Sequence, residues 1–292
     1  MKKLVIFGIG YVGQHLAASL KHQYEIIATS RDIATSREGG DGLLAWSGGQ
    51  NAELATYIEQ ADAVLCCIPP NAEGDLAYVS FADIIRQSKV KWLGYLSTTG
   101  VYGDHGGGDV DEQTPLNPQS ERAKKRVLAE RQWAKLASDK CGVNIFRLPG
   151  IYGPNLAGKS RSAFGALTAG TAKRIDVRLK NGKKHFFCRA HVDDIVQVIS
   201  ASLGKNLLGI NIYNIADDLP APQADIVAYT AKLMGIDAPK LITQPEANMS
   251  DMAQSFYAEC KYINNDKIKN ILGVKLKYPD YKQGLSAIWQ LQ

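Results

Sequence analysis

The amino-acid sequence predicts an α/β protein with a doubly wound parallel sheet and a smaller lobe towards the C-terminus. Strand-like and helix-like segments alternate along most of the chain, which favours a parallel sheet with helices on both faces. A glycine-rich turn follows the first strand-like segment directly and opens the first helix-like one. That order is half of a βαβ unit.

The first element lies in KKLVIFGIGYVGQHLAASL, residues 2–20, where a short β-rich run precedes the turn. The three glycines of the turn fill the pattern G-x-G-x-x-G, in which a missing Cβ permits a tight turn, an approach to a pyrophosphate and close helix packing. The helix N-terminus then favours the phosphates through its free N–H groups and its dipole. The predicted cofactor-binding residues of this turn are Gly8, Gly10, Tyr11, Val12 and Gly13. A Rossmann dinucleotide site is the preferred interpretation, and a purely structural glycine turn is the alternative.

The second strand, YEIIATSRD, ends where such proteins choose between NAD and NADP. An acidic residue there would bind the ribose 2′-hydroxyl and repel a 2′-phosphate. This chain has Thr29, Ser30 and Arg31, with Asp32 one place later. Because hydroxyls and a guanidinium suit a phosphate, Ser30 and Arg31 predict NADP, with NAD the less favoured cofactor. An Arg31–Asp32 surface pair would leave the choice open.

Further strands are predicted at residues 62–70, 92–100, 143–148 and 210–215. Ligands of parallel sheets lie beyond the carboxyl ends of the strands. The residues expected along that crevice are Ile68, Pro69, Pro70, Ser97, Thr98, Thr99, Pro149 and Ile151. From about Ala224 the chain mixes short helices with turns and predicts the smaller lobe.

Composition narrows the class of protein. The chain has 292 residues, 45% of them hydrophobic, and five scattered cysteines without metal-binding spacing. No apolar run approaches the roughly 20 residues that span a bilayer. A cytoplasmic protein with no metal site and no membrane partner is expected. The net charge is +5, with basic clusters at 121–131 and 173–189. The first cluster has the pattern of an amphipathic helix, with Val127, Leu128 and Trp133 expected to face inward. These clusters suit a solvated helix face or an anionic cofactor or substrate, and nucleic acid is not the expected partner.

The stretch GPNLAGKS, Gly153 to Ser160, matches the phosphate-binding pattern G-x-x-x-x-G-K-[ST]. A nucleotide triphosphatase through Lys159 is therefore an alternative. The pattern requires a strand that ends in the loop and a helix that begins at the Lys. Here four residues separate the strand-like run 143–148 from the loop, so we expect a connection into the smaller lobe instead.

Four segments carry a family resemblance: STTGVYGD (97–104), RLPGIYGP (147–154), FCRAHVDDI (187–195) and YNIAD (213–217). With the glycine turn, they resemble the extended or atypical short-chain dehydrogenase/reductases, also called the NAD-dependent epimerase/dehydratase family. The resemblance implies an NADP-binding Rossmann domain over 1–155, its sheet completed by about 191–220, and a substrate lobe of 156–190 and 221–292. It also suggests a homodimer through long helices.

In that superfamily a Ser or Thr holds the reacting oxygen, a Tyr passes the proton and a Lys four residues later binds the ribose. Alignment on VYG places the Ser/Thr role on Thr98, whose alternative is a hydroxyl bonded to backbone. The helix pattern Tyr-x-x-x-Lys-x-x-x-Glu, ending at Glu130, puts Arg122 at the Tyr position and Arg126 at the Lys position. An arginine stays protonated and has no acceptor, so the usual relay is absent. Arg126 is expected on cofactor ribose or phosphate and Arg122 on an oxyanion, with solvated helix charges as the alternative.

The proton then needs another source, and Tyr102, His105, His191 and bulk water are the candidates. Tyr102 has aromatic packing as its alternative role. We expect an NADP-dependent oxidoreductase or epimerase with a small-molecule substrate, phosphorylated or nucleotide-linked, near Lys184 and Arg189. The alternative is a catalytically impaired, NADP-binding regulatory protein.

Overall fold

A computed structural model describes residues 1–31, 42–156, 159–205 and 207–291. Its centre is a seven-stranded sheet in the order β12-β7-β5-β4-β1-β2-β3, in which every neighbouring pair is parallel. The strands are β1 (Lys2–Phe7), β2 (Tyr24–Ser30), β3 (Leu43–Ala45), β4 (Ala63–Cys66), β5 (Trp92–Thr98), β7 (Gly142–Leu148) and β12 (Gly209–Asn214). The predicted doubly wound α/β fold is confirmed, with the short β3 as an unpredicted edge strand.

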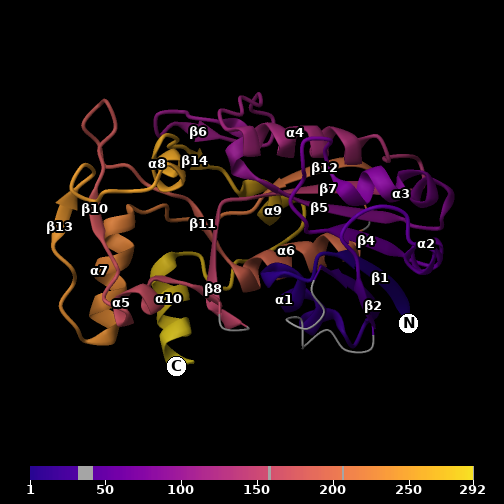
Figure 1. The fold of residues 1–292 in the computed structure, drawn as a ribbon, viewed down its shortest axis with the longest axis horizontal. Helices are drawn as coiled ribbons and strands as arrows, with labels where there is room; N and C mark the ends of the chain where they lie inside the picture. Colours follow the sequence, from indigo (N-terminus) through magenta and orange to yellow (C-terminus); the bar gives the residue numbers. More distant parts are fainter. Residues whose placement is uncertain (32–41, 157–158, 206, 292) are drawn as a thin grey trace.

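Helices cover both faces of the sheet (Figure 1). One face carries α1 (Tyr11–Leu20) and α6 (Val192–Lys205), and the other α2 (Ala52–Glu59), α3 (Leu76–Gln87) and α4 (Glu121–Ala134). Side chains alternate along a strand, so each strand supplies both layers. In β1, Leu4 and Ile6 pack with the α1 and α6 layer, whereas Val5 and Phe7 pack with the other.

The basic segment 121–131 lies in α4 and is amphipathic as expected, with one exception. Trp133 is fully buried and Val127 nearly so, whereas Leu128, expected to face inward, is 39% exposed. The inward face of α4 also carries Glu130, which is 4% exposed. A buried carboxylate on a strongly basic helix requires a buried partner.

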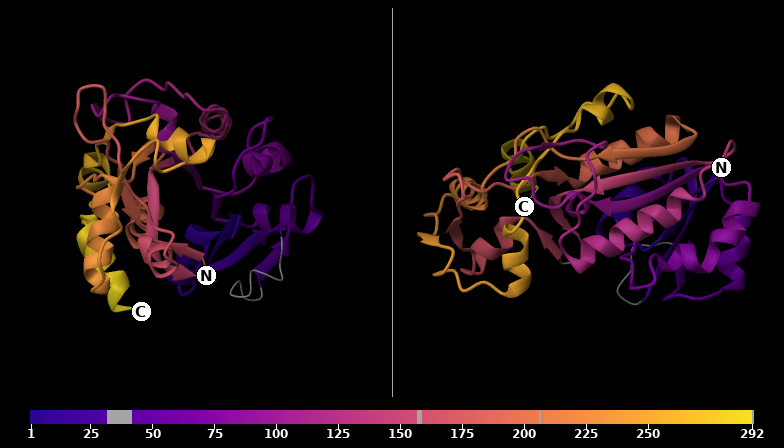
Figure 2. Two further views of the ribbon diagram at one scale, coloured as in Figure 1. Left: turned by 60° about the vertical axis from the view of Figure 1, so that its left-hand side comes forward. Right: turned by 90° about the horizontal axis from the view of Figure 1, so that it is seen from above.

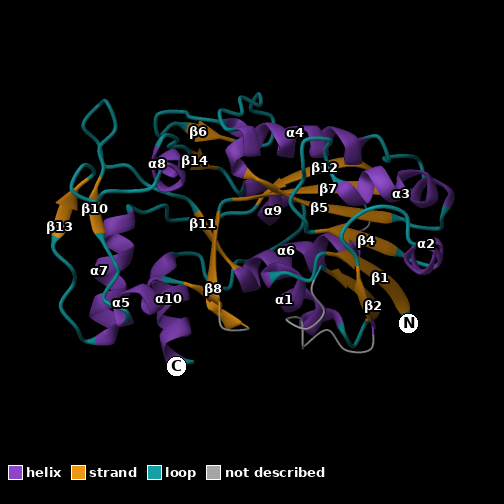
Figure 3. Ribbon diagram, in the orientation of Figure 1, coloured by secondary structure: helices purple, strands orange, loops and turns teal. Residues whose placement is uncertain are grey.

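The chain leaves the sheet after β7, builds the smaller lobe, and returns through α6 to β12 (Figures 1 and 3). The lobe holds α5 (Ala163–Thr168), α7 (Gln223–Met234), α8 (Asp251–Tyr257) and α10 (Tyr281–Gln290), while α9 (Asp266–Asn270) lies against β12. Its small sheets pair β8 (Gly150–Leu156) with β11 (Arg189–His191) and β9 (Lys159–Arg161), β10 (Arg174–Asp176) with β13 (Leu241–Thr243), and β6 (Asp109–Val110) with β14 (Tyr262–Ile263). Figure 2 shows this lobe beside the sheet, with the two chain ends on different parts of the molecule.

The stretch Gly153–Ser160 forms parts of β8 and β9, which pair antiparallel. Ala157 and Gly158 lie outside the described residues. Lys159 begins a strand, and the next helix, α5, begins at Ala163. A phosphate-binding loop needs a helix at its Lys, so the connection expected from the sequence is the better description. Within the described part of the chain, no helix is long and apolar enough to cross a bilayer.

Candidate active site

The glycine turn between β1 and α1 packs tightly at two glycines and is open at the third. Gly8 has a φ of +89°, which side chains disfavour, and its N–H donates to Thr29 Oγ1 at 3.0 Å. A Cβ on Gly8 would lie 2.6 Å from Ile68 Cγ2, and a Cβ on Gly13 would lie 2.9 Å from the Gly8 carbonyl oxygen. Among the described residues, no atom apart from its chain neighbours and the backbone of α1 lies within 4 Å of the Cβ position of Gly10. The turn thus presents bare backbone to an open space.

That open space lies at the N-terminus of α1, where Gly10 is the N-cap and provides no side-chain hydrogen bond. The first N–H groups of a helix have no partner inside the helix, and they favour an anion. The Tyr11 hydroxyl donates to the Pro154 carbonyl at 2.8 Å and ties the turn to β8, while Val12 is buried against the sheet. These residues fit a dinucleotide pyrophosphate.

The end of β2 opens onto a pocket of about 230 Å³. Arg31 is exposed at its edge, and the other lining residues come from the end of β3 and the segment after it: Ala45, Trp46, Ser47, Gly48, Gln50 and Asn51. The Ser30 carbonyl accepts from the Trp46 N–H at 2.9 Å. The Thr29 hydroxyl is used inside the glycine turn. Asp32 lies outside the described residues, and so does its expected pairing with Arg31.

Arg126 lies at the carboxyl ends of β4 and β5, between the predicted crevice residues. Its Nη1 donates to the carbonyls of Leu96 at 2.8 Å and Ile68 at 3.2 Å, and to the Tyr95 hydroxyl at 2.9 Å. The guanidinium therefore holds the two strand ends together just before Pro69. Among the described residues, its Nε and Nη2 have no hydrogen-bond partner, so that edge is available to a ligand.

The side chains of Ser97 and Tyr102 belong to a buried polar network. Ser97 Oγ donates to Glu130 Oε1 at 2.5 Å, and Arg147 holds both Glu130 oxygens, at 3.1 and 2.8 Å. Arg147 Nη1 donates to the Tyr102 hydroxyl at 2.8 Å, which donates to Asn214 Oδ1 at 2.7 Å. Tyr102 is fully buried, and burial raises its pKa to about 12. The structure gives Tyr102 the packing role that was the alternative, since its hydroxyl is enclosed in the core.

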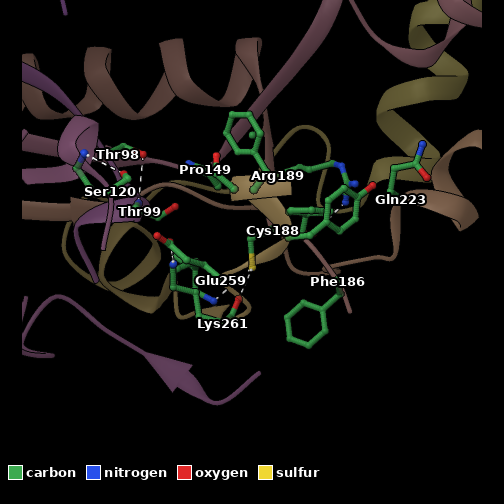
Figure 4. A pocket seen from close by; sticks show the side chains of 18 of the residues that line it. Thr98, Thr99, Ser120, Pro149, Phe186, Cys188, Arg189, Gln223, Glu259 and Lys261 are labelled. Carbon is green, nitrogen blue, oxygen red and sulfur yellow. Dashed lines mark hydrogen bonds and ion pairs between the residues drawn. The ribbon is translucent and has the colours of Figure 1, made fainter. Parts of the chain in front are cut away.

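A cavity of about 470 Å³ lies between the ends of β5 and β7 and the smaller lobe. Thr98, Thr99 and Ser120 line one side of it, and Arg189 and Gln223 the other (Figure 4). Pro149 lies between the two sides. Thr98 Oγ1 accepts from the Gly100 N–H at 3.2 Å, which leaves its own proton for another partner. The hydroxyl of Thr98 therefore forms the backbone hydrogen bond expected of its alternative, structural role. The same residue also lines the cavity.

Arg122 lies in the wall of the same cavity and is exposed. Its Cζ is 4.8 Å from the centre of the Phe256 ring, a cation–π contact that joins α4 to α8. The next residue, Tyr257, also lines the cavity and packs edge-on against Phe187 with ring centres 5.1 Å apart. Burial raises the pKa of Tyr257 above its ordinary value, so it carries its proton at neutral pH. Tyr257 could not be predicted from the sequence, because it is far along the chain and belongs to no recognised motif.

A second cavity of about 310 Å³ adjoins the first. Ile151, Tyr152, Tyr281 and other apolar residues line it, and Gly150 and Arg189 line both cavities. Gly150 and Arg189 face each other across the parallel pair β8–β11. Of the crevice residues, Pro149 thus lies at the first cavity and Ile151 at the second.

The remaining candidates lie away from both cavities. His191 is buried; its Nδ1 accepts from the Asp193 N–H at 3.1 Å, and burial lowers its pKa to about 4. His105 Nε2 is 3.2 Å from the Tyr102 carbonyl oxygen. Lys184 is exposed and lies 3.7 Å from an Asp225 oxygen. In the described residues, no group of three or more His, Cys, Asp or Glu side chains could hold a metal ion.

The family model for the NAD dependent epimerase/dehydratase family matches residues 4–216. The chain belongs to this family. The match covers the glycine turn, Thr98 and the seven strands of the central sheet except the first two residues of β1. The protein is therefore an NAD(P)-binding epimerase/dehydratase-family member with a Rossmann-type sheet.

Three relatives are similar over nearly their whole length. A functionally unknown conserved protein from Silicibacter pomeroyi has a solved structure with a TM-score of 0.85, 38% identity and 99% of each chain covered. Protein YeeZ of Escherichia coli is 28% identical over 96% of this chain and 97% of its own. A Streptomyces 3-diazoavenalumate denitrifying reductase is 24% identical over 98% of this chain and 99% of its own. The family is thus shown, and the relatives differ in how much is known of their activity.

Proposed function

We propose that the protein is an NADP-dependent oxidoreductase acting on a small molecule held in the 470 Å³ cavity. The observation that carries this proposal is the open backbone at Gly10, above the uncapped N-terminus of α1 and at the same sheet edge as Thr98. Parallel sheets bind ligands at that edge. A family relative whose name identifies it as a reductase supports the same reaction class.

Arg31 supports NADP over NAD. It is the charged residue of the pocket at the end of β2, and it has no ion pair among the described residues. The N-terminus of α2 and the Ser47 hydroxyl belong to the same pocket, and Asn51 Oδ1 already caps that helix at the Leu54 N–H. A guanidinium beside hydroxyl and N–H donors favours a 2′-phosphate through charge-assisted hydrogen bonds.

In the proposed reaction, NADPH held at the glycine turn and at Arg31 would provide the hydride for an electrophilic carbon such as that of a carbonyl group. Thr98 donates its hydroxyl proton in a hydrogen bond to the substrate oxygen, while the Gly100 N–H holds Thr98 Oγ1 in place. The oxygen must gain one proton as the carbon gains the hydride. Because the position of the family tyrosine is occupied by Arg122, we assign this proton to the Tyr257 hydroxyl, which lines the same cavity. The guanidinium of Arg122 stabilises negative charge on the oxygen without moving a proton.

A single protonated phenol on the cavity wall fits reduction better than epimerisation. Tyr257 keeps its proton at neutral pH, so it starts as a proton donor and not as a base, although burial, by raising its pKa, also makes it a weaker acid. An epimerase needs both roles at one carbon. The proposal therefore narrows the expected oxidoreductase or epimerase to a reductase.

A second candidate is an NADP-binding regulatory protein without turnover. It is favoured by Arg126, which occupies the position of the family's ribose-binding lysine. The Nη1 of Arg126 is bound to two carbonyls and to the Tyr95 hydroxyl. It is also favoured by the enclosed hydroxyl of Tyr102.

The test is calorimetric titration of the nucleotide-free protein with NADPH, NADH and Mg-ATP, followed by a carbonyl panel in which loss of NADPH absorbance is measured. Tight NADPH binding with turnover that falls in Tyr257→Phe supports the reductase. Tight NADPH binding, with no turnover on any member of the panel, favours the regulatory protein. Binding of ATP but not of NADPH would overturn both.

A further inference from the structure

Arg189 occupies an unusual place, because it lines both cavities at the point where they adjoin. It begins β11 and faces Gly150 of β8. Its Nη1 donates to the carbonyls of Phe187 and Ala221, both at 2.9 Å. These two bonds fix the plane of the guanidinium, which loses little further freedom when a ligand binds.

The other edge of this guanidinium is available. Among the described residues, no hydrogen-bond acceptor is bound by Nε or Nη2 of Arg189, and no carboxylate lies within ion-pair distance of it. The Nε–Nη2 edge is one of the two parallel donor pairs that hold a carboxylate bidentately. A fixed guanidinium with an unoccupied donor pair at a cavity wall is a preformed anion site.

The charge of Arg189 is not offset by its nearest acidic neighbour. The Asp217 N–H donates to the Arg189 carbonyl at 2.7 Å, and the Asp217 carboxyl is 4% exposed with no hydrogen-bond partner for either oxygen. Burial raises the pKa of this carboxyl to about 8, against the smaller opposing effect of Arg189. Asp217 is therefore mostly neutral at pH 7, and Arg189 keeps an uncompensated positive charge.

The other charged residues of the 470 Å³ cavity do not form a second anion site with a fixed, unpaired cation. Lys261 Nζ lies 2.6 Å from Glu259 Oε2 and also donates to the Gly103 carbonyl, so this pair is neutral as a unit. Arg122 is exposed and stacked on Phe256. A nucleoside diphosphate would bring several negative charges to a wall with one fixed cation, whereas a single carboxylate matches it.

Four aromatic residues line the cavity that Arg189 and Thr98 share. Phe186, Phe187, Phe256 and Tyr257 all lie in the wall of the 470 Å³ cavity. Aromatic walls favour flat apolar rings, through area burial and ring–ring contacts. The same wall also has hydroxyl and amide groups at Thr98, Thr99, Ser120 and Gln223, so the ring-containing class is favoured by the aromatic side chains and the fixed Arg189, and not by a lack of polar groups.

We propose that the substrate is a ring-containing organic monoacid, with its carboxylate on the Nε–Nη2 edge of Arg189 and its ring between the aromatic walls. This inference rests on the proposed reductase function and narrows it to a substrate class. The reacting group then points towards Thr98 at the opposite wall (Figure 4). The phosphorylated or nucleotide-linked substrate expected from the sequence is the competing class.

The experiment is calorimetric titration of the intact, NADPH-loaded protein with trans-cinnamate, with its neutral amide cinnamamide, and with UMP. Cinnamate should bind roughly 10- to 100-fold more tightly than cinnamamide, as one charge-assisted bidentate contact requires. In Arg189→Met the two ligands should bind equally. Arg178→Met removes an exposed arginine of the same lobe outside both cavities, and it should leave the preference intact.

The comparison of acid with amide on the unaltered protein needs no variant, so it remains decisive if Arg189→Met fails to fold. Arg189→Lys, which keeps the charge without the fork, should retain part of the preference. Equal binding of acid and amide, a preference that survives Arg189→Met, or tighter Arg189-dependent binding of UMP would each overturn the acid site. Failure of NADPH to bind would refute the proposed function instead, and this is measured separately before the acids are added.

Discussion

Replacing Gly10 by aspartate should weaken cofactor binding without lowering the stability of the fold. Gly10 has φ −77° and ψ −164°, which any residue adopts. In the part of the chain that the structure describes, no atom beyond its chain neighbours and the helix backbone lies within 4 Å of its Cβ position. It is also the N-cap of α1, where aspartate exceeds glycine by a few tenths of a kcal/mol through its hydrogen bond to the first turn. The cofactor-free Gly10→Asp protein should therefore be as stable as the parent, or slightly more so.

The same carboxylate would stand where a pyrophosphate approaches the helix. Two unit charges 4 Å apart repel by about 1 kcal/mol in water and by about 4 kcal/mol near a protein surface. NADPH affinity should accordingly fall by a factor between roughly 5 and 10³ from charge alone. Gly10→Asn is the matched control, because it has the same size and capping ability without the charge. It should lose less affinity than Gly10→Asp.

The assay pairs calorimetric titration of NADPH with thermal unfolding of the nucleotide-free protein. Gly13→Ala should have the opposite effect and lower the stability of the nucleotide-free protein. Its Cβ would lie 2.9 Å from the Gly8 carbonyl oxygen and should destabilise the fold by about 1–3 kcal/mol. If Gly10→Asp folds and binds NADPH with unchanged affinity, the cofactor does not lie on this turn and the reasoning fails.

Four further predictions test other residues. Arg31→Ala should weaken NADPH binding more than NADH binding, and equal losses in parallel titrations would argue against a 2′-phosphate contact. Tyr257→Phe should lower kcat by about 10²-fold or more with little change in KM, whereas an unchanged kcat would remove it as the proton donor. Glu130→Gln should reduce the free energy of unfolding in urea by about 3–5 kcal/mol, because Arg147 is left buried without its counter-charge; a loss below 1 kcal/mol would contradict this. Burial raises the pKa of folded Asp217 to about 8, above its unfolded value, so its contribution to stability is full in acid and is lost as the pH rises towards 8. The free energy of unfolding should fall by at most about 1.4 kcal/mol per pH unit over this range. Asp217→Asn should remove this slope, and an unchanged slope in the variant would refute the assignment.

Local features of the sequence predicted much of the strand–turn–helix unit at the start of the chain and of the sheet edge beside it. Gly8, Gly10 and Gly13 could be interpreted because their roles depend on backbone angles and on contacts within one strand–turn–helix unit. Thr98 could be placed because it directly ends a strand, and strand ends of a parallel sheet meet at one edge. The amphipathic pattern of α4 located its buried face, although Leu128 proved exposed.

The substrate end could not be predicted in the same way. Tyr102 and Tyr257 look alike in the sequence, but the first is enclosed by Arg147 and Asn214 while the second lines the cavity. Similarly, the sequence does not show which N–H donors of Arg126 and Arg189 are bound to backbone carbonyls and which are left without a protein partner. Only the packed structure shows this.

The sequence by itself thus determined the parallel α/β sheet, the family and the glycine turn, because periodicity and backbone conformation are properties of neighbouring residues. Tertiary structure alone decided which hydroxyl and which guanidinium face the cavity. Those outcomes depend on which groups from distant segments, such as Phe256 and Ala221, arrive to bury or bind each side chain. A side chain's role as donor, anchor or core residue follows from the partners that remain to it once the chain has packed.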